Sequence, residues 1–235
     1  MKMEANKDSI QYMSVVKTAD WTADDFDAVI LCSGDFPTHR IPFGILQSAQ
    51  FLVACDDAGE RLVNHSGIVP DAVVGDGDSM SPEFRRKYAD RIHIVSEQEY
   101  NDQTKATRFC VARGCRRIAY IGSTGRREDH TIGNIALLQF YRREFGVNPV
   151  MLTDYGTFLP CLGDVRFATF PRQQVSIFNH SCSCMTGDGL RWHPYAAGEL
   201  WQTTLNEATG SEVTLHADGE YTLFLTHKQK ADASQ

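Results

Sequence analysis

The segment RIHIVSEQEYNDQTKATRFCVARGCRRIAYIG, residues 91–122, indicates the fold class most clearly. Two runs rich in β-branched residues, 91–96 and 117–122, enclose a helix-compatible stretch from Asp102 to Arg113. Each run resembles a buried strand that ends in a small or polar residue. Apolar strands separated by helices are typical of a parallel sheet that is covered on both faces. The segment therefore predicts a strand–helix–strand unit of an α/β domain.

The same alternation extends over the first two thirds of the chain. Further strands are predicted at residues 27–34, 51–56, 71–76 and 148–153, and further helices at residues 41–50, 82–89 and 130–144. After about Asp154 the segments become short, often alternate in polarity, and are divided by Gly, Asp, Asn and Pro. We predict a parallel-sheet α/β domain over residues 1–155, followed by a small antiparallel β-sandwich over residues 156–235.

Composition excludes several classes of protein. The 235 residues are 42% hydrophobic and 23% charged, and a chain of this length and hydrophobic content can bury a sizeable core. The net charge of −7 argues against non-specific nucleic-acid binding as the main function. No apolar run approaches the roughly 18 residues that span a bilayer, and the first ten residues lack the apolar stretch of a signal peptide. We expect a cytoplasmic protein without membrane or nucleic-acid partners. The seven scattered cysteines are interpreted as reduced core residues, since no CxxC pair or histidine cluster completes a zinc set.

Two aspartates stand where a predicted strand ends, in VVGDGDSM, residues 73–80. Asp76 and Asp78 are candidate ligands for a hard cation such as Mg²⁺, which takes one or two carboxylates together with water and phosphate oxygens. Gly75 and Gly77 would let the backbone turn tightly and admit a bulky anion. The alternative is an ordinary Asp/Gly turn in which Asp78 caps the following helix.

A second polar stretch, EQEYNDQTKATRF at residues 97–109, follows a predicted strand and opens a helix. Asp102 falls at or near the helix N-terminus, where it can cap, and Lys105 lies one turn further on, where it can face a phosphate. Glu97 and Glu99 add carboxylates. The alternative is a solvated helix start with an acidic first turn.

The most informative stretch is IGSTGRREDHTIGNIALL, residues 121–138. A loop of small residues follows a strand and leads into an amphipathic helix, so its backbone N–H groups and the helix N-terminus suit an anion. Arg126 and Arg127 add guanidinium groups suited to phosphate. The loop is not a Walker A motif, because the GK[ST] ending is absent. Asp129 and His130 have three open roles: capping the helix, orienting an arginine, or contacting substrate.

The β region contributes an aromatic candidate. Trp192 or Trp201 could stack on a flat, cationic heteroaromatic ring, although core packing is the default role of a tryptophan. Thr203, Thr204 and Asn206 are polar neighbours in the sequence that would suit the wall of a binding pocket.

The order of these motifs resembles the thiamine pyrophosphokinase (thiamine diphosphokinase) family over about residues 29–225. The matching segments are CDDAGERL, GIVPDAVVGDGDS, EQEYNDQTKA, GSTGRREDHTIGNIALL, GLRW and TTLNEA. The resemblance implies an N-terminal α/β nucleotide-binding domain, a C-terminal β-sandwich, and a homodimer with sites between subunits. It also implies transfer of a diphosphoryl group from ATP to the hydroxyl of thiamine, with Mg²⁺, giving AMP and thiamine diphosphate.

The resemblance carries roles onto individual positions. Metal ligands are expected at Asp76, Asp78 and Asp102, and these three act in catalysis together with Arg127. The resemblance and the sequence patterns described above together predict the contacts to ATP and its phosphates. These are expected from Asp56, Gln98, Lys105, Arg126, Arg127, Asp129 and His130. Thiamine contacts are expected from Trp192, Thr204 and Asn206. Asn134 occupies the position of an asparagine in the family's motif.

The sequence also departs from the family pattern. DDAGE stands where the family shows DGGAN, EQEYND replaces DQDxTD, and Leu205 falls on the serine position before Asn206. Two alternatives therefore stay open: a related kinase or pyrophosphokinase with another hydroxymethyl heterocycle as acceptor, and a non-catalytic nucleotide- or thiamine-binding regulator. AMP as product distinguishes diphosphoryl transfer from an ordinary kinase, whereas a regulator would show ligand-dependent stabilisation without turnover.

Overall fold

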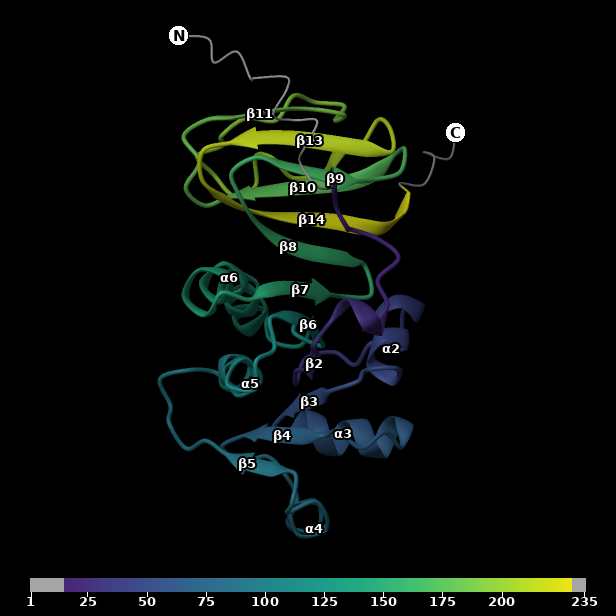
Figure 1. Ribbon diagram of the computed structural model, residues 1–235, viewed down its shortest axis with the longest axis vertical. Coiled ribbons are helices and arrows are strands. Elements are labelled where there is room, and N and C mark those ends of the chain that lie inside the picture. Colours follow the sequence, from purple (N-terminus) through teal and green to yellow (C-terminus); the bar gives the residue numbers. More distant parts are fainter. Residues whose placement is uncertain (1–14, 230–235) are drawn as a thin grey trace. The chain divides into compact units, whose positions relative to one another are not determined.

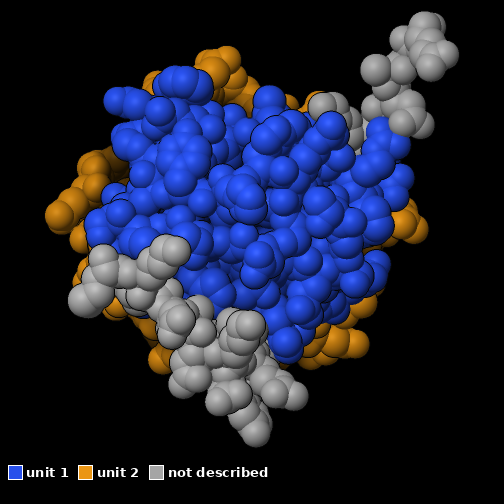
Figure 2. All heavy atoms as spheres, turned by 90° about the horizontal axis from the view of Figure 1, so that it is seen from above, with its two compact units in different colours: residues 1–20, 161–235 blue, residues 21–160 orange. Residues whose placement is uncertain are grey.

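A computed structural model describes residues 15–229 of the chain, which divide into two compact units (Figures 1 and 2). The α/β unit comprises residues 21–160, and the β unit comprises residues 161–229 with residues 15–20. The predicted division after residue 155 placed residues 15–20 with the α/β half. They group instead with the β half, where strand β1 (Val15–Val16) pairs with β9 (Val165–Ala168). Residues 1–14 and 230–235, which the same division assigned to the α/β domain and the β-sandwich respectively, lie outside the described residues.

The α/β unit is built on a parallel sheet in the order β7-β6-β2-β3-β4-β5. Its strands are β2 (Ala28–Leu31), β3 (Leu52–Cys55), β4 (Ala72–Gly75), β5 (Ile92–Ile94), β6 (Arg117–Ile121) and β7 (Asn148–Leu152). Strand β8 (Gly156–Leu162) pairs antiparallel with β7. Every parallel strand lies inside a predicted range, so the α/β expectation is confirmed.

Helices cover both faces of this sheet (Figure 1). They are α2 (Arg40–Gln47), α3 (Asp57–Ser66), α4 (Pro82–Lys87), α5 (Asp102–Val111) and α6 (Glu128–Phe145), with a short 3₁₀ turn η1 (Ala23–Asp25). Helix α3 was not predicted, because Gly59 weakens its helical pattern. The glycine is required for close packing: a Cβ atom at Gly59 would lie 2.8 Å from a methyl carbon of Val73 on β4.

The strand order places a switch point beside β2. The chain runs outward from β2 through β3 and β4 to β5, then returns to the opposite side of β2 with β6 and β7. In open α/β sheets, ligands bind outside the carboxyl ends of the strands where the order reverses. The loops that follow β2 and β6 are therefore expected to frame a binding crevice.

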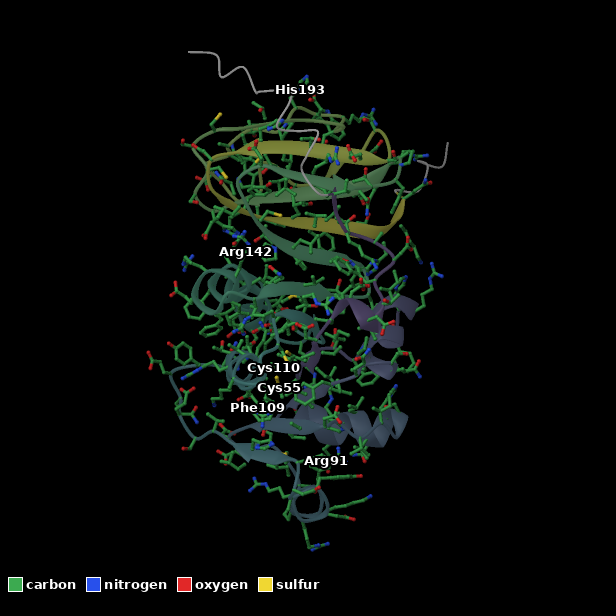
Figure 3. All side chains as sticks on the ribbon, viewed as in Figure 1. Cys55, Arg91, Phe109, Cys110, Arg142 and His193 are labelled. Atoms are coloured by element: carbon green, nitrogen blue, oxygen red, sulfur yellow. The ribbon has the colours of Figure 1, made fainter. Side chains whose placement is uncertain are left out.

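The main core lies between this sheet and helices α5 and α6. Side chains that alternate along the strands face it, including Ile30, Val53 and Tyr120, and α5 contributes Ala106 and Cys110. Figure 3 labels Cys55 and Cys110 close to α5. All seven cysteines are free thiols, and six of them are buried, as predicted; only Cys184 is exposed.

The β unit contains two sheets. In one, β9 and β11 (Met185–Asp188) flank β13 (Glu212–Ala217) in antiparallel pairs, and β1 joins β9 in parallel. In the other, β10 (Gln173–Asn179) pairs antiparallel with β12 (Asn206–Glu207) and β14 (Glu220–Gln229). Apolar residues from both sheets are fully buried, which confirms the sandwich expectation. Within residues 15–229, none of the helices combines the length and apolar character that crossing a membrane requires.

Candidate active site

A cavity of about 410 Å³ opens at the carboxyl ends of strands β2 to β6. Its size lies within the usual range for small-molecule sites. The cavity brings together seven predicted site residues, namely Asp76, Gln98, Asp102, Lys105, Arg126, Arg127 and His130. The rest of its lining consists of Cys32, Ser33, Gly34, Cys55, Tyr100, Asn101, Gln103, Ser123, Gly125 and Asn134. Five consecutive strand ends thus converge on one site, at the predicted switch point.

Asp76 stands at the cavity wall directly after β4. One carboxylate oxygen accepts the backbone N–H of Asp78 at 3.1 Å, and the other accepts the side-chain amide of Gln98 at 3.2 Å. These two hydrogen bonds lower the pKa of Asp76 below its ordinary value. Asp76 is therefore held as an ionised carboxylate, and Gln98 orients it.

Asp102 faces the same cavity from the first turn of α5. It was expected to be able to cap this helix, but the cap is Asn101, whose side-chain oxygen accepts the Thr104 N–H at 3.0 Å. The Asp102 carboxylate instead lies 3.4 Å from the ammonium nitrogen of Lys105, which is only 4% exposed. Burial raises the pKa of Asp102, Lys105 opposes that shift, and the charges of Asp56 and Asp76 add to it.

The donor set at this wall fits a hard cation that also binds phosphate. Asp76 and Asp102 line one cavity, and burial, the main cause of the raised pKa of Asp102, disfavours the ionised form of this carboxyl group, which a bound cation would stabilise. Among residues 15–229, no group of three or more His, Cys, Asp or Glu side chains is arranged to hold a metal ion. Mg²⁺ needs only one or two carboxylates when phosphate oxygens and water complete its shell.

Asp78, the third predicted metal ligand, is exposed and lies outside the cavity lining. Its observed contribution is the backbone N–H that it donates to Asp76. The Asp78 side chain does not cap α4 either, since Ser81 takes that position and accepts the Phe84 N–H at 3.1 Å. A metal-binding role for the Asp78 carboxylate stays a prediction.

Asp56 anchors the loop that carries Asp76. It is 5% exposed, lies outside the cavity lining, and accepts the Gly77 N–H at 3.1 Å. Its backbone adopts φ +42°, a conformation that costs free energy for a residue other than glycine and is concentrated at functional sites. The structure thus gives Asp56 a supporting role, and its expected contact with ATP stays a prediction.

The two arginines after β6 are held in different ways. The Arg126 guanidinium donates to the Ser33 carbonyl at 3.0 Å and lies 3.9 Å from the Asp57 carboxylate. Arg127 forms a two-point contact with Asp129, at 3.1 Å from Nε and 2.6 Å from Nη2. Of the three roles open for Asp129, this contact supports orientation of Arg127. Capping is not observed, because the N-cap of α6 is Arg127. Asp129 lies outside the lining, whereas His130 is within it.

A network of amide side chains at the cavity was missed in the sequence. The Asn134 side chain donates to the Ser123 carbonyl at 2.8 Å and accepts the Asn101 amide at 2.8 Å. Gln103 donates to the backbone carbonyl of Asn134 at 3.3 Å. The network joins α5, α6 and the loop after β6. An asparagine directly before a helical pattern is a capping signal, which could have identified Asn101.

Arg61 on α3 was also missed. It donates to the carbonyls of Ser33 and Gly34, each at 3.1 Å, so the loop after β2 is held by Arg61 and Arg126 together. This loop packs directly on the loop after β6, and a Cβ atom at Gly34 would lie 2.3 Å from the Thr124 carbonyl oxygen. The two loops that frame the switch point therefore pack against each other, joined by backbone hydrogen bonds from Gly34 to Gly122 at 2.7 Å and from Asp35 to Thr124 at 2.9 Å.

The predicted thiamine contacts lie in the β unit. The Asn206 side chain accepts the Trp192 N–H at 3.1 Å and donates to the Trp192 carbonyl at 2.7 Å, so it fixes the turn that carries this tryptophan. Trp192 is 52% exposed, which is unlike a core residue. The Thr204 hydroxyl donates to the Trp201 carbonyl at 2.7 Å. The Trp192 ring is half exposed, with the Arg191 guanidinium 5.1 Å from its centroid, and contacts with thiamine stay predictions.

Fold and site together define the class of protein: a two-domain enzyme with an α/β domain, whose switch point gathers carboxylates and cations suited to phosphate, and a β-sandwich domain. The family follows from two family models. "Thiamin pyrophosphokinase, catalytic domain" matches residues 44–148, and "Thiamin pyrophosphokinase, substrate-binding domain" matches residues 156–224. The chain belongs to the thiamin pyrophosphokinase family, which confirms the resemblance drawn from the motifs.

Solved structures agree on the fold. Thiamin pyrophosphokinase from Candida albicans has a TM-score of 0.72 at 14% identity, over 91% of this chain and 95% of that one. Thiamine pyrophosphokinase from Bacillus subtilis has a TM-score of 0.69 at 17% identity, over 85% and 99%. Yeast thiamin pyrophosphokinase has a TM-score of 0.69 at 14% identity, over 86% of each chain. No curated protein matches the sequence.

Proposed function

We propose that this enzyme transfers a diphosphoryl group from ATP to the hydroxyl of thiamine, giving thiamine diphosphate and AMP. Family membership supports the reaction class. The observation that carries the proposal is the single cavity in which Asp76 and Asp102 lie with Lys105, Arg126 and Arg127. Such a mixture of carboxylates and cations suits a polyphosphate bound together with a metal ion.

Catalysis in this proposal depends on positioning and on charge. The acceptor hydroxyl gives up its proton as its oxygen attacks the β-phosphorus, the bond between the β-phosphorus and the oxygen that bridges it to the α-phosphate breaks, and AMP leaves with that oxygen. Arg127, oriented by Asp129, and Lys105 stabilise the negative charge that moves onto the phosphate oxygens. Asn134 and Arg61 keep the surrounding loops in place, so little reorganisation is needed when the substrate binds.

The proposal includes Mg²⁺. Asp76 and Asp102 would hold the ion, with Asp78 as a further candidate ligand, and the ion would supply neutralisation of phosphate charge. ATP binding is proposed to be assisted by Asp56, Gln98 and His130. Asp56 holds the loop that carries Asp76, and Gln98 holds the Asp76 carboxylate.

The acceptor end belongs to the β unit. We propose that Trp192 stacks on thiamine, with Thr204 and Asn206 nearby, and that the enzyme acts as a homodimer in the cytoplasm. Exposed apolar side chains on the β unit support a partner surface; they are Trp192, Tyr195, Leu200, Trp201 and Leu205.

Product analysis tests this function. Purified protein is incubated with MgATP and thiamine, and the nucleotide products are separated. AMP and thiamine diphosphate in equal amounts are expected. ADP would indicate a simple kinase, and turnover only with another hydroxymethyl heterocycle would assign a different acceptor. Thermal stabilisation by ligands without any product would indicate a regulator.

A further inference from the structure

Two thiols lie side by side in the lining of the active-site cavity. Cys55 ends β3, and Cys32 directly follows β2. Leu31 pairs with Ala54 in the parallel ladder, so Cys32 and Cys55 are the next residues along the two strands. Both belong to the core cluster beneath α5 and α6, and their sulfur atoms are 3.9 Å apart.

The surroundings of the two sulfur atoms differ. Cys32 accepts a hydrogen bond from the Ser123 hydroxyl at 3.3 Å and donates to the Gln103 side chain at 3.5 Å. Cys55 donates to Cys32, and this bond together with burial raises the pKa of the Cys55 thiol. Cys32 lies between the Ser123 hydroxyl and the Cys55 thiol, which both donate to its sulfur, so we take Cys32 as the sulfur that reacts first and Cys55 as the thiol that resolves it.

The usual spacing of adjacent strands is compatible with a bond between these residues. Adjacent strands are about 4.8 Å apart, which falls within the range of roughly 4.4–6.8 Å found between the Cα atoms of disulfide-bonded cysteines. The sulfur atoms would have to approach to about 2 Å. The cavity gives a small reagent access to both, although the residues are only 5% and 1% exposed.

We propose that Cys32 and Cys55 form an oxidation site that takes a hydroperoxide through the active-site cavity. The Cys32 thiolate attacks one peroxide oxygen, the O–O bond breaks, and the leaving oxygen takes a proton, giving a sulfenic acid and water or an alcohol. The Cys55 sulfur then attacks the Cys32 sulfur. The S–O bond breaks, hydroxide leaves with the Cys55 proton as water, and a disulfide forms. Two thiols are oxidised and one peroxide is reduced.

Disulfide formation would disturb the site through Ser123. Movement of the Cys32 sulfur breaks its contacts with Ser123 and Gln103, and both of these residues bond to Asn134. The oxidised enzyme is therefore expected to lose activity in proportion to the fraction that is linked, and dithiothreitol should restore it. This effect on activity rests on the proposed function, whereas the disulfide itself does not.

The test treats the full-length, folded protein with hydrogen peroxide and maps its disulfides by mass spectrometry. The intact mass should fall by two hydrogen atoms, and digestion should give a linked peptide pair that contains Cys32 and Cys55. MgATP should slow the linkage by occupying the cavity. Linkage at the same rate with and without MgATP would support the thiol pair while contradicting nucleotide binding in this cavity.

Matched variants complete the test. Cys55→Ser should abolish the linkage, and Cys110→Ser, at a buried thiol of the same core that lies outside the cavity lining, should leave it unchanged. Thermal unfolding checks that both variants fold. If either variant does not fold, disulfide mapping of the unmodified protein still tests the proposal. Oxidation that links Cys110 with Cys115, or Cys182 with Cys184, while Cys32 and Cys55 stay reduced would overturn the proposal.

Discussion

Asp76 carries its negative charge at the cavity wall because the Asp78 N–H and the Gln98 amide both stabilise the ionised carboxylate. If Asp76 holds the metal ion, Asp76→Asn should lower kcat/KM by about 100-fold or more, since electrostatic contacts in phosphoryl-type transfer are worth several kcal/mol. Its half-buried position predicts only a small change in stability. Steady-state kinetics and thermal unfolding measure the two effects.

The matched control is Asp90→Asn, at an exposed aspartate of the same unit that lies outside the cavity lining. It should leave both kinetics and unfolding unchanged. Activity of Asp76→Asn close to that of the unmodified enzyme would remove Asp76 from the metal site.

At the level of single residues, the sequence predicted which residue types form the site better than it predicted their hydrogen-bond partners. The aspartates and arginines of the cavity were predicted because acidic and cationic groups after strands suit phosphate and metal ions. Asp102 was expected to be able to cap α5, but the cap is its neighbour Asn101, and the position of this asparagine directly before the helical pattern was the signal that could have identified it. By contrast, only coordinates show that Asp129 contacts Arg127 rather than capping the helix.

At the level of elements, Asp27 joins the starts of β2 and β6. Its carboxylate accepts the backbone N–H groups of Arg116 and Arg117, at 2.8 and 2.9 Å, and two further bonds from the Arg117 side chain. Burial alone would raise the pKa of Asp27, but these hydrogen bonds outweigh it, so the pKa lies below the ordinary value of 3.8. This stabilisation is complete above that value and is lost as the pH falls through the lower folded-state pKa.

We expect Asp27→Asn to lower the free energy of unfolding of the α/β unit by about 1–3 kcal/mol at neutral pH. The variant should also lose less stability than the unmodified protein when the pH falls below 3.8, because one depressed carboxyl group is gone. Urea unfolding at neutral and acidic pH measures both effects. Parallel pH profiles for Asp27→Asn and the unmodified protein would contradict this interpretation.

The turn that carries Trp192 gives a second prediction at this level. Asn206→Ala removes the two hydrogen bonds that fix the turn, and the Trp192 ring should then lose its set position. The KM for thiamine should rise about tenfold, while the KM for ATP should stay unchanged because Asn206 lies in the other unit. Initial rates with each substrate varied in turn measure both constants. Asn148→Ala, at an exposed asparagine of the α/β unit, is the control.

If Asn206→Ala changes both constants equally, Trp192 does not act at the thiamine end alone. Unchanged constants would show that the fixed turn has no part in binding the acceptor.

For the whole molecule, the sequence predicted the parallel sheet, the β-sandwich and the family. Continuous apolar strands and ordered motifs carry that information directly. Helix α3 was missed because close packing on Val73, a contact distant in sequence, requires the glycine that weakens the pattern. The grouping of β1 with the β unit was missed for a similar reason: two residues that pair with β9, about 150 positions later, leave no local signal.

In the proposed reaction, one cavity directs attack on the β-phosphorus of ATP. The most direct measurement supplies thiamine with MgATP that carries radioactive phosphorus in the β position, and then follows the label. We predict that the label moves into thiamine diphosphate, that unlabelled AMP accumulates with it one to one, and that Asp76→Asn almost abolishes both. Label that stays in ADP while thiamine gains a single phosphate would exclude diphosphoryl transfer.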